Sequence, residues 1–400
     1  MNTRKNQRRY ELDWLRVLAI LAIFVFHCTR PFDAYDWHIK NQTTYSAIDV
    51  WKEFALTWGM PLILLISGAS VFFGLEKISG RKYLKGICAR LLLPLLVGIF
   101  THVALQVYLE IKQKGSFSGS FWQFYPHYFE GMYGFGGNFA WMGLHLWYLE
   151  VLFILSVLLL PLFLWLKKSR SGQRVLNSLG NFLALPGAVF TLALPAFVLL
   201  RTLDEASWGN QSMGGWSVFI YPSFFIAGFL IISNGRLQAR IRQMRWLSLG
   251  LGVVLTPVYL FLEFQTRYQL YMLPVGTKDL LNCLVCWSWL LVVFGFGMQH
   301  LSFNTPFLKY ANEAVLPFYI LHQTVIVFLG FFILGWAIPD LLKFIVILLA
   351  SFAVVMLIYE FLVRRFNLLR FLFGMKLRPR AHEKTPEAAP AGSPGALPPL

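Results

Sequence analysis

The sequence predicts an all-α protein that crosses a membrane about ten times, with both termini in the cytoplasm. Of its 400 residues, 57% are hydrophobic and only 14% are charged. The chain also contains 38 Phe, 14 Trp and 16 Tyr residues, which makes it too apolar and too aromatic for a soluble domain of this length. The net charge of +16 does not indicate nucleic acid as a partner, because the basic residues stand between apolar segments, where they set topology.

The apolar segments give the number of spans. A membrane-spanning helix needs about 20 predominantly apolar residues, and on this basis the chain divides into ten expected spans. Their centres lie near Ile20, Leu65, Phe100, Leu155, Leu192, Ile226, Val254, Leu291, Val325 and Val354.

The distribution of charge gives the orientation. With the N-terminus in the cytoplasm, 26 of the 35 Lys and Arg residues fall on the cytoplasmic side of the ten spans. This asymmetry follows the positive-inside rule and predicts a protein of the bacterial inner (cytoplasmic) membrane, whose other side is the periplasm.

Three regions are expected along the chain: a basic cytoplasmic arm over residues 1–12, a transmembrane domain over 13–378, and a disordered tail rich in Pro and Ala over 379–400. The long external loop at about 111–144 combines glycines with many aromatic residues. Such a loop favours either a platform on which sugars stack or an aromatic belt at the membrane interface.

The first span, residues 13–30, carries the strongest functional signal. Arg16 lies near one end and His27 near the other. Eleven residues of α-helix advance ~16 Å and turn by about 1,100°, close to three full turns, so the two side chains share one face. An ionisable group within a span marks a functional site by default. Asp13, three residues before Arg16, is the expected partner of that arginine.

His27 is the expected catalytic base, because desolvation favours the neutral form of an imidazole. The alternative is a structural hydrogen bond between helices. Glu150 lies at a similar depth in the fourth span, and it is a second catalytic candidate because a carboxylate could orient the imidazole.

Further candidates lie near the expected external side. His322, in the ninth span, is as well suited to contact a ligand as to bond between helices. His145 and Trp147 stand at an external mouth, where they could contact an acceptor or anchor the interface. Cys283 and Cys286 form a single Cys-x-x-Cys pair without a nearby histidine, so no metal site is expected.

On the cytoplasmic side, a group of basic residues could converge on an anionic ligand. Arginine suits bidentate phosphate contacts and lysine acts as a point charge. The alternative is that they set topology and contact lipid headgroups. The residues are Arg16, Arg81, Lys82, Lys85 and Arg90.

These features together resemble the acyltransferase 3 family of membrane acyltransferases. Arg16, ten intervening residues and His27 match the family's signature, and LISGASVFF and PFYILHQTV resemble later motifs in the expected order. The stretches FHCTRPFDAYDWHIKN, which contains the possible pocket residue His38, and HLWYLEVLFILS are similar to one branch, the glucan biosynthesis protein C type. The resemblance covers most of residues 10–376.

The resemblance implies transfer of an acyl group, succinyl or acetyl, from cytoplasmic acyl-CoA to a hydroxyl of a periplasmic glucan, with no permanently bound cofactor. The family's arginine would hold the CoA phosphates and its histidine would act at the reacting end. One departure concerns the Arg-x-x-Arg pair before the third span: Arg90 matches its second member, but Ile87 occupies the first, and Lys85 is the nearest basic residue.

Two other functions stay open at this point. A transporter or flippase for a lipid-linked or anionic glycan would also explain buried polar residues and an aromatic external loop. An acyltransferase for another acceptor, such as lipopolysaccharide or a different exopolysaccharide, would use the same machinery. Consumption of a thioester would distinguish the enzyme from the transporter.

Overall fold

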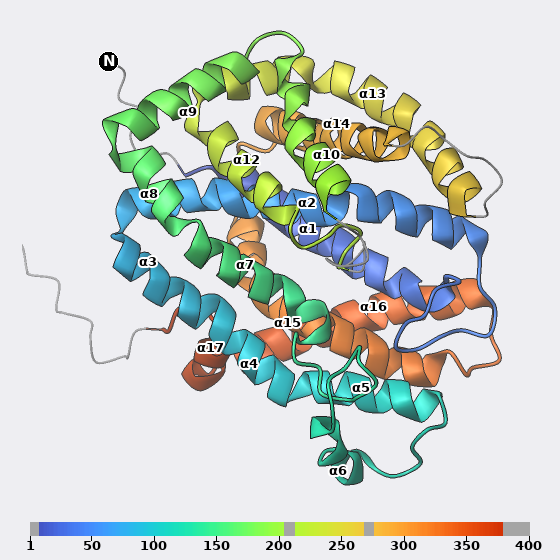
Figure 1. Cartoon of the computed structure of the whole chain (residues 1–400). Helices are drawn as coiled ribbons and strands as arrows, with labels where there is room; N and C mark the ends of the chain where they lie inside the picture. Colours follow the sequence, from blue (N-terminus) through green and yellow to red (C-terminus); the bar gives the residue numbers. More distant parts are fainter. Residues whose placement is uncertain (1–7, 204–212, 268–275, 379–400) are drawn as a thin grey trace, which may run out of the picture.

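A computed structural model describes residues 8–203, 213–267 and 276–378 of the chain (Figure 1). These segments fold into helices joined by loops, with two isolated β-bridges and no strand among them. The prediction of an all-α protein is therefore confirmed. The tail expected over 379–400 and the first seven residues of the basic arm lie outside the described residues.

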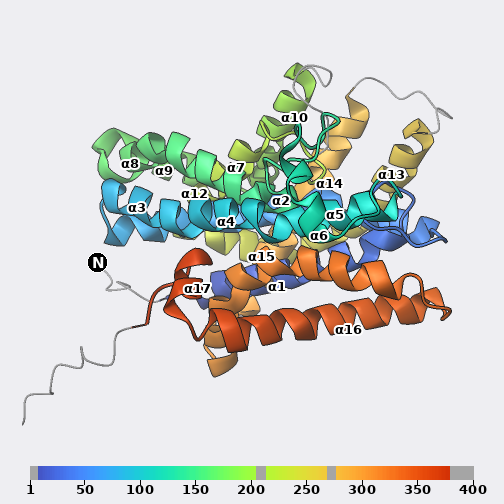
Figure 2. The ribbon, with the colours of Figure 1, turned by 90° about the horizontal axis from the view of Figure 1, so that it is seen from below.

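The first helix, α1 (Tyr10–Thr29), lies at the centre of the bundle. It packs against α2 (Ser46–Lys77), α14 (Thr277–His300), α15 (Pro306–Ile333) and α16 (Asp340–Ile358). Figure 2 shows that α16 covers the outer side of α15, away from α2. Twenty residues of helix extend for ~30 Å, which is the thickness of a bilayer's hydrocarbon core.

Further helices complete the bundle around this centre. In chain order they are α3 (Gly80–Ile87), α4 (Leu93–Phe100), α5 (His102–Gln113), α6 (Phe121–Phe124), α7 (Trp147–Leu158), α8 (Leu160–Lys168), α9 (Arg170–Leu183), α10 (Ala193–Thr202), α12 (Tyr221–Ser233), α13 (Gly235–Arg267) and α17 (Asn367–Leu372).

The described residues contain seven helical segments that are long and apolar enough to cross a membrane, or eight if α7 and α8 form one bent span. The two other expected spans, near Leu192 and Ile226, fall on shorter apolar helices, Ala188–Thr202 and Tyr221–Ser233. The polytopic class is thus confirmed. The count of ten spans and the cytoplasmic placement of the termini stay predictions.

Two glycines explain how the short helix α12 packs so closely on α2. A Cβ atom added at Gly68 of α2 would lie 1.8 Å from the Phe225 carbonyl oxygen, and one at Gly228 would lie 1.9 Å from the Leu65 carbonyl oxygen. Each backbone therefore occupies the space that a side chain would need on the other helix. Small residues allow this close approach, which packs apolar helices tightly without a hydrophobic driving force.

Irregular turns shape the helices beside α1. Five residues of π-helix, Cys88–Leu92, join α3 to α4, and they carry Arg90. A 49° bend separates α7 from α8, and Pro161 begins the second of these helices, where a missing N–H has no cost. Since π-turns in α-helices are frequent at functional sites, the position of Arg90 on one of them is notable.

Candidate active site

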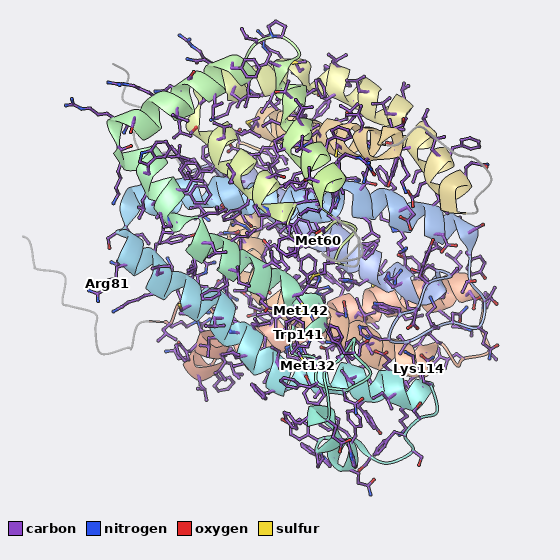
Figure 3. All side chains as sticks on the ribbon, viewed as in Figure 1. Met60, Arg81, Lys114, Met132, Trp141 and Met142 are labelled. Carbon is purple, nitrogen blue, oxygen red and sulfur yellow. The ribbon has the colours of Figure 1, made fainter. Side chains whose placement is uncertain are left out.

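One face of α1 forms the wall of a cavity of about 320 Å³. Ala19, Ile23, His27 and Arg30 line it, and their spacing of three or four residues continues back to Arg16. The other walls come from α2, from the start of α7 and from the turn at Gly214 and Gly215. Met60 of α2, labelled in Figure 3, also lines the cavity.

The partner of His27 is another histidine. Its Nδ1 lies 2.8 Å from Nε2 of His322 on α15, and the two ring planes are inclined by 28° with centroids 5.0 Å apart. The Trp37 ring lies parallel to the His27 ring at 6.4 Å. His322 is fully buried, so its ring is held by the protein on all sides.

The catalytic candidate Glu150 does not contact His27. In the described part of the chain it forms no hydrogen bond or ion pair, and its Oε2 atom is buried without a partner. The sequence predicts a similar depth for Glu150 and His27, but a similar depth does not make two helices neighbours. The residue bonded to Nδ1 of His27 is His322 on α15. A catalytic role for Glu150 stays a prediction.

The segment Tyr319–Thr324 of α15 connects several buried polar residues around this pair. The Tyr319 hydroxyl donates to the His145 carbonyl, and the His145 ring donates to the Ile320 carbonyl at 3.1 Å. His145 and Trp147 both line the cavity, and their predicted contact with an acceptor stays a prediction. Nδ1 of His145 is buried and forms no hydrogen bond with the described residues.

The next two residues of α15, Gln323 and Thr324, extend the network away from the cavity. The Gln323 amide donates to Gln106 at 3.0 Å and lies 3.1 Å from Nε2 of His38. Thr324 accepts from Gln106 at 2.6 Å and lies 2.8 Å from Nδ1 of His102. His38 thus belongs to the network behind the cavity wall and is not among the residues that line the cavity.

Sequence reasoning missed Glu110, the buried carboxylate of this network. Its Oε2 lies 2.6 Å from Nδ1 of His38 and accepts from the Tyr133 hydroxyl at 2.8 Å, while its Oε1 accepts from Lys114 at 2.8 Å. These contacts attach the aromatic loop to the histidine network. The signal was present, since Glu110 follows Gln106 by four residues and therefore shares its helical face.

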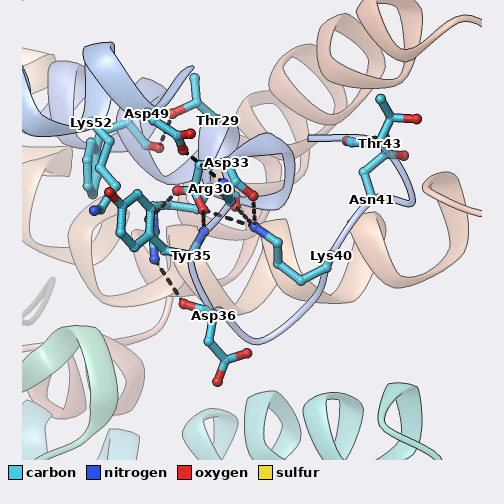
Figure 4. A network of polar contacts seen from close by, with 12 residues as sticks. Thr29, Arg30, Asp33, Tyr35, Asp36, Lys40, Asn41, Thr43, Asp49 and Lys52 are labelled. Carbon is cyan, nitrogen blue, oxygen red and sulfur yellow. Dashed lines mark hydrogen bonds and ion pairs between the residues drawn. The ribbon is translucent and has the colours of Figure 1, made fainter. Parts of the chain in front are cut away.

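Two cations, Arg30 and Lys52, line the same cavity as His27. Arg30 pairs with Asp33 (Figure 4), and Lys52 pairs with its neighbour Glu53 at 2.9 Å. Lys40 also pairs with Asp33, at 3.0 Å.

This arrangement presents two paired cations to the cavity. No Asp or Glu occurs among the described residues that line it. Burial raises the pKa of the Asp33 carboxyl, whereas Arg30 and Lys40 act in the opposite direction. Because the two carboxylates that pair with the wall's cations stand behind it, the cavity favours a ligand with a negatively charged group.

The Arg16 end of α1 has a different character. Arg16 donates to the Ser70 hydroxyl at 2.7 Å and to Asn312 at 3.3 Å, and it pairs with Asp13 at 3.4 Å. The predicted Asp13–Arg16 pair is therefore confirmed. Its side chain keeps 30% exposure, so a ligand could reach it.

The other predicted donor-binding residues lie on α3 and the π-turn. Arg90 is within electrostatic reach of Arg16 and forms no hydrogen bond or ion pair with the described residues. Arg81, which Figure 3 labels, and Lys85 are exposed and likewise have no such partner in the described segments. The structure thus places Arg90 close to Arg16.

Metal chemistry finds no support in the residues that the structure describes. No group of three or more His, Cys, Asp and Glu side chains there is arranged to hold a metal ion. Cys283 and Cys286 are buried free thiols of α14.

The fold and the site define a class: a polytopic membrane protein with two hydrogen-bonded histidines beside a cavity that cations line. An arginine lies on the same helix as one of these histidines, His27. The model of the acyltransferase 3 family, described as an acyltransferase domain, matches residues 9–360, and the chain belongs to this family. The resemblance drawn from the motifs is confirmed.

Curated relatives cover almost the whole chain. Glucans biosynthesis protein C of Salmonella paratyphi B is 24% identical over 382 residues, which are 92% of this chain and 95% of the relative. The proteins of the same name from Salmonella dublin and Salmonella enteritidis match with the same identity and coverage. No solved structure matches the chain.

Proposed function

We propose that this membrane acyltransferase transfers an acyl group from acyl-CoA to a hydroxyl of a glucan, with donor and acceptor meeting at His27. The family supports the reaction class, and the name of the relatives supports a glucan as the acceptor. The observation that carries the proposal is the position of Arg16 and His27 on one face of α1, with His27 in a cavity wall.

The donor would extend along α1. Arg16 and Arg90 would hold the phosphates, which would place the pantetheine arm along the helix. Arg90 has no hydrogen-bond or ion-pair partner among the described residues. The ~16 Å between Arg16 and His27 is on the order of the length of that arm. Ala19 and Ile23, which lie between them on the same face, present only short or apolar side chains.

At the reacting end, His27 would take the proton of the acceptor hydroxyl while its oxygen attacks the thioester carbonyl carbon. The C–S bond then breaks, and the proton on His27 passes to the thiolate, which leaves as the CoA thiol. General-base assistance of this kind contributes ~10²–10⁴-fold. Transfer through an acyl-His27 intermediate would give the same products in two steps.

The cationic wall favours succinyl over acetyl as the transferred group. Arg30 is three residues beyond His27, or ~4.5 Å along the helix, so a short acyl chain at His27 brings its end close to this wall. A succinyl group presents a carboxylate there, to which Arg30 and Lys52 could donate charge-assisted hydrogen bonds. An acetyl group offers no such acceptor to either cation.

The aromatic lining favours a sugar as the acceptor. Phe26, Trp51, Trp58 and Trp147 line the cavity, and Trp147 is held by stacking on Tyr221 with ring centroids 5.7 Å apart. The indole Nε1 atoms of Trp51 and Trp58 are buried and form no hydrogen bond with the described residues. Aromatic faces beside unused donors suit a ligand with apolar ring faces and many oxygens.

The experiment is thiol release by the full chain in nanodiscs, with succinyl-CoA or acetyl-CoA and a soluble glucan. We expect His27→Ala to lower turnover by ~10²–10⁴-fold. His300→Ala is the matched control, because His300 is exposed at the end of α14. Turnover retained by folded His27→Ala would contradict the proposal, and no release from the folded wild type with either donor would also contradict it.

A further inference from the structure

His27, His322 and the Tyr319 carbonyl form a row in which only one arrangement of protons fits neutral rings. Nδ1 of His322 lies 2.6 Å from the Tyr319 carbonyl oxygen. A carbonyl oxygen only accepts hydrogen bonds, so Nδ1 of His322 carries the proton. In a neutral imidazole the other nitrogen then holds a lone pair, so Nε2 of His322 is an acceptor.

The proton position on His322 determines the proton position on His27. Because Nε2 of His322 accepts, Nδ1 of His27, 2.8 Å away, must carry a proton and donate it. The lone pair of neutral His27 therefore lies on Nε2. That atom forms no hydrogen bond with the described residues, and the His27 ring lines the cavity.

We infer that His322 is a positioning residue that holds His27 in the tautomer whose Nε2 acts as the base. This inference rests on the proposed function and adds to it the atom that takes the proton and the residue that selects it. His322 itself touches no substrate in this account: it acts through the His27 ring, as the carboxylate of a hydrolase triad acts on its histidine.

The surroundings explain why the row is built from neutral groups. No Asp or Glu side chain among the described residues forms a hydrogen bond with either ring of the pair. A buried imidazolium without a counter-charge is costly, so both rings are held neutral. The other titratable groups facing the pair are His145, His102, His38, Arg30 and Tyr319, none of which supplies a negative charge at neutral pH.

The His322 ring is also fixed in place by packing. The Phe318 ring, one turn earlier on α15, lies parallel to it at 6.2 Å, and Phe24 of α1 meets it edge-on at 6.4 Å. The His145 ring contacts it edge-on from another side at 5.2 Å. A partner held in this way keeps the His27 ring oriented without using a charge.

Two substitutions of similar size separate the acceptor role from a structural one. His322→Gln places a carbonyl oxygen where Nε2 was, so the row still accepts from His27, whereas His322→Met removes the acceptor. We expect kcat for thiol release to fall a few-fold at most in the glutamine variant and by at least tenfold in the methionine variant. KM for the donor should be unchanged in both. The loss cannot exceed the ~10²–10⁴-fold contribution of the base itself.

Both variants are compared at equal amounts of folded protein, measured by thermal unfolding in nanodiscs. Equal losses in the two folded variants, or a loss that appears only in KM, would overturn the inference. His322→Glu adds a readout that packing does not affect. A carboxylate acceptor stabilises protonated His27, so the acidic limb of the kcat/KM profile should move to higher pH, and an unmoved limb would overturn the inference.

A second measurement does not depend on turnover. In full-length protein labelled with ¹⁵N-histidine, the resonances lost in His27→Asn identify His27, and their chemical shifts report which nitrogen carries the proton. We expect the Nδ1–H tautomer in wild type, and the Nε2–H tautomer would overturn the inference. Failure of thiol release with the Nδ1–H tautomer present would instead count against the proposed function alone.

Discussion

At the His27 end of α1, the polar groups are buried and bonded to one another, whereas at the Arg16 end the arginines are partly exposed. His322 is fully buried and bonded on both of its nitrogens. Arg16 keeps 30% exposure, and Arg90 beside it has no partner among the described residues. The two proposed tasks would explain the contrast: proton transfer needs one fixed geometry, while phosphate binding needs charge that a ligand can reach.

Loss of Arg16 should give the largest effect on binding. We expect Arg16→Gln to raise KM for acyl-CoA by ~10–100-fold with a smaller change in kcat, because a hydrogen bond to a charged group is worth about 1.5–3 kcal/mol. Arg174→Gln is the matched control, since Arg174 is an exposed arginine of α9 outside the predicted donor-binding group. Similar KM values for the two variants in steady-state kinetics would contradict a donor-binding role for the Arg16 end of α1.

Loss of Lys52 should change selectivity more than rate. We expect Lys52→Met to lower the preference for succinyl-CoA over butyryl-CoA, which has the same chain length without the carboxylate, by about tenfold. Lys52→Arg should keep the preference, and Lys168→Met, at an exposed lysine of α8, is the control. The measurement is the ratio of kcat/KM for the two donors. An unchanged ratio in Lys52→Met would show that Lys52 has only a structural role.

Loss of Glu110 should act through the aromatic loop. Glu110→Gln removes the charge that His38, Lys114 and Tyr133 share, and we expect it to destabilise the protein by about 1–3 kcal/mol. Limited proteolysis should then cut residues 111–144 faster, while the KM for acyl-CoA stays unchanged because Arg16 is at the other end. Glu130→Gln, at an exposed carboxylate of the same loop, is the control. Equal cleavage rates for the two variants would contradict the attachment of the loop through Glu110.

Glu150 should show the smallest effect. If turnover depends on groups that contact the His27 ring, Glu150→Gln should keep kcat within about twofold of wild type, as for substitutions away from bonded networks. A loss as large as that of His27→Ala would instead restore the catalytic role that the sequence predicts for this carboxylate. Thiol release at saturating donor distinguishes the two results.

The features that lie within one helix could be predicted from the sequence. Arg16, His27 and Asp13 share a face because helical geometry fixes it, and the structure confirms the Asp13–Arg16 pair. The partner of His27 could not be predicted, since His322 is 295 residues away and only the packing of α1 on α15 joins them. Depth in the bilayer suggested Glu150, but depth does not decide which helices are neighbours.

The number of spans is also limited in how far it can be predicted from the sequence. Hydropathy counts α12 as a full span, because nothing in a window of apolar residues records where a helix ends. The structure gives it 13 residues, Tyr221–Ser233, packed on α2 through Gly68 and Gly228. Composition therefore predicts the class of the fold, while helix lengths and partners depend on tertiary contacts.

The central claim is that the two ends of α1 divide the work, with donor binding at Arg16 and chemistry at His27. Its most direct test is equilibrium binding of CoA by calorimetry, for wild type, Arg16→Gln and His27→Asn in nanodiscs. The account predicts wild-type affinity in His27→Asn, which should be inactive, and affinity weakened by ~10–100-fold in Arg16→Gln. Weakened binding in His27→Asn together with wild-type binding in Arg16→Gln would contradict it.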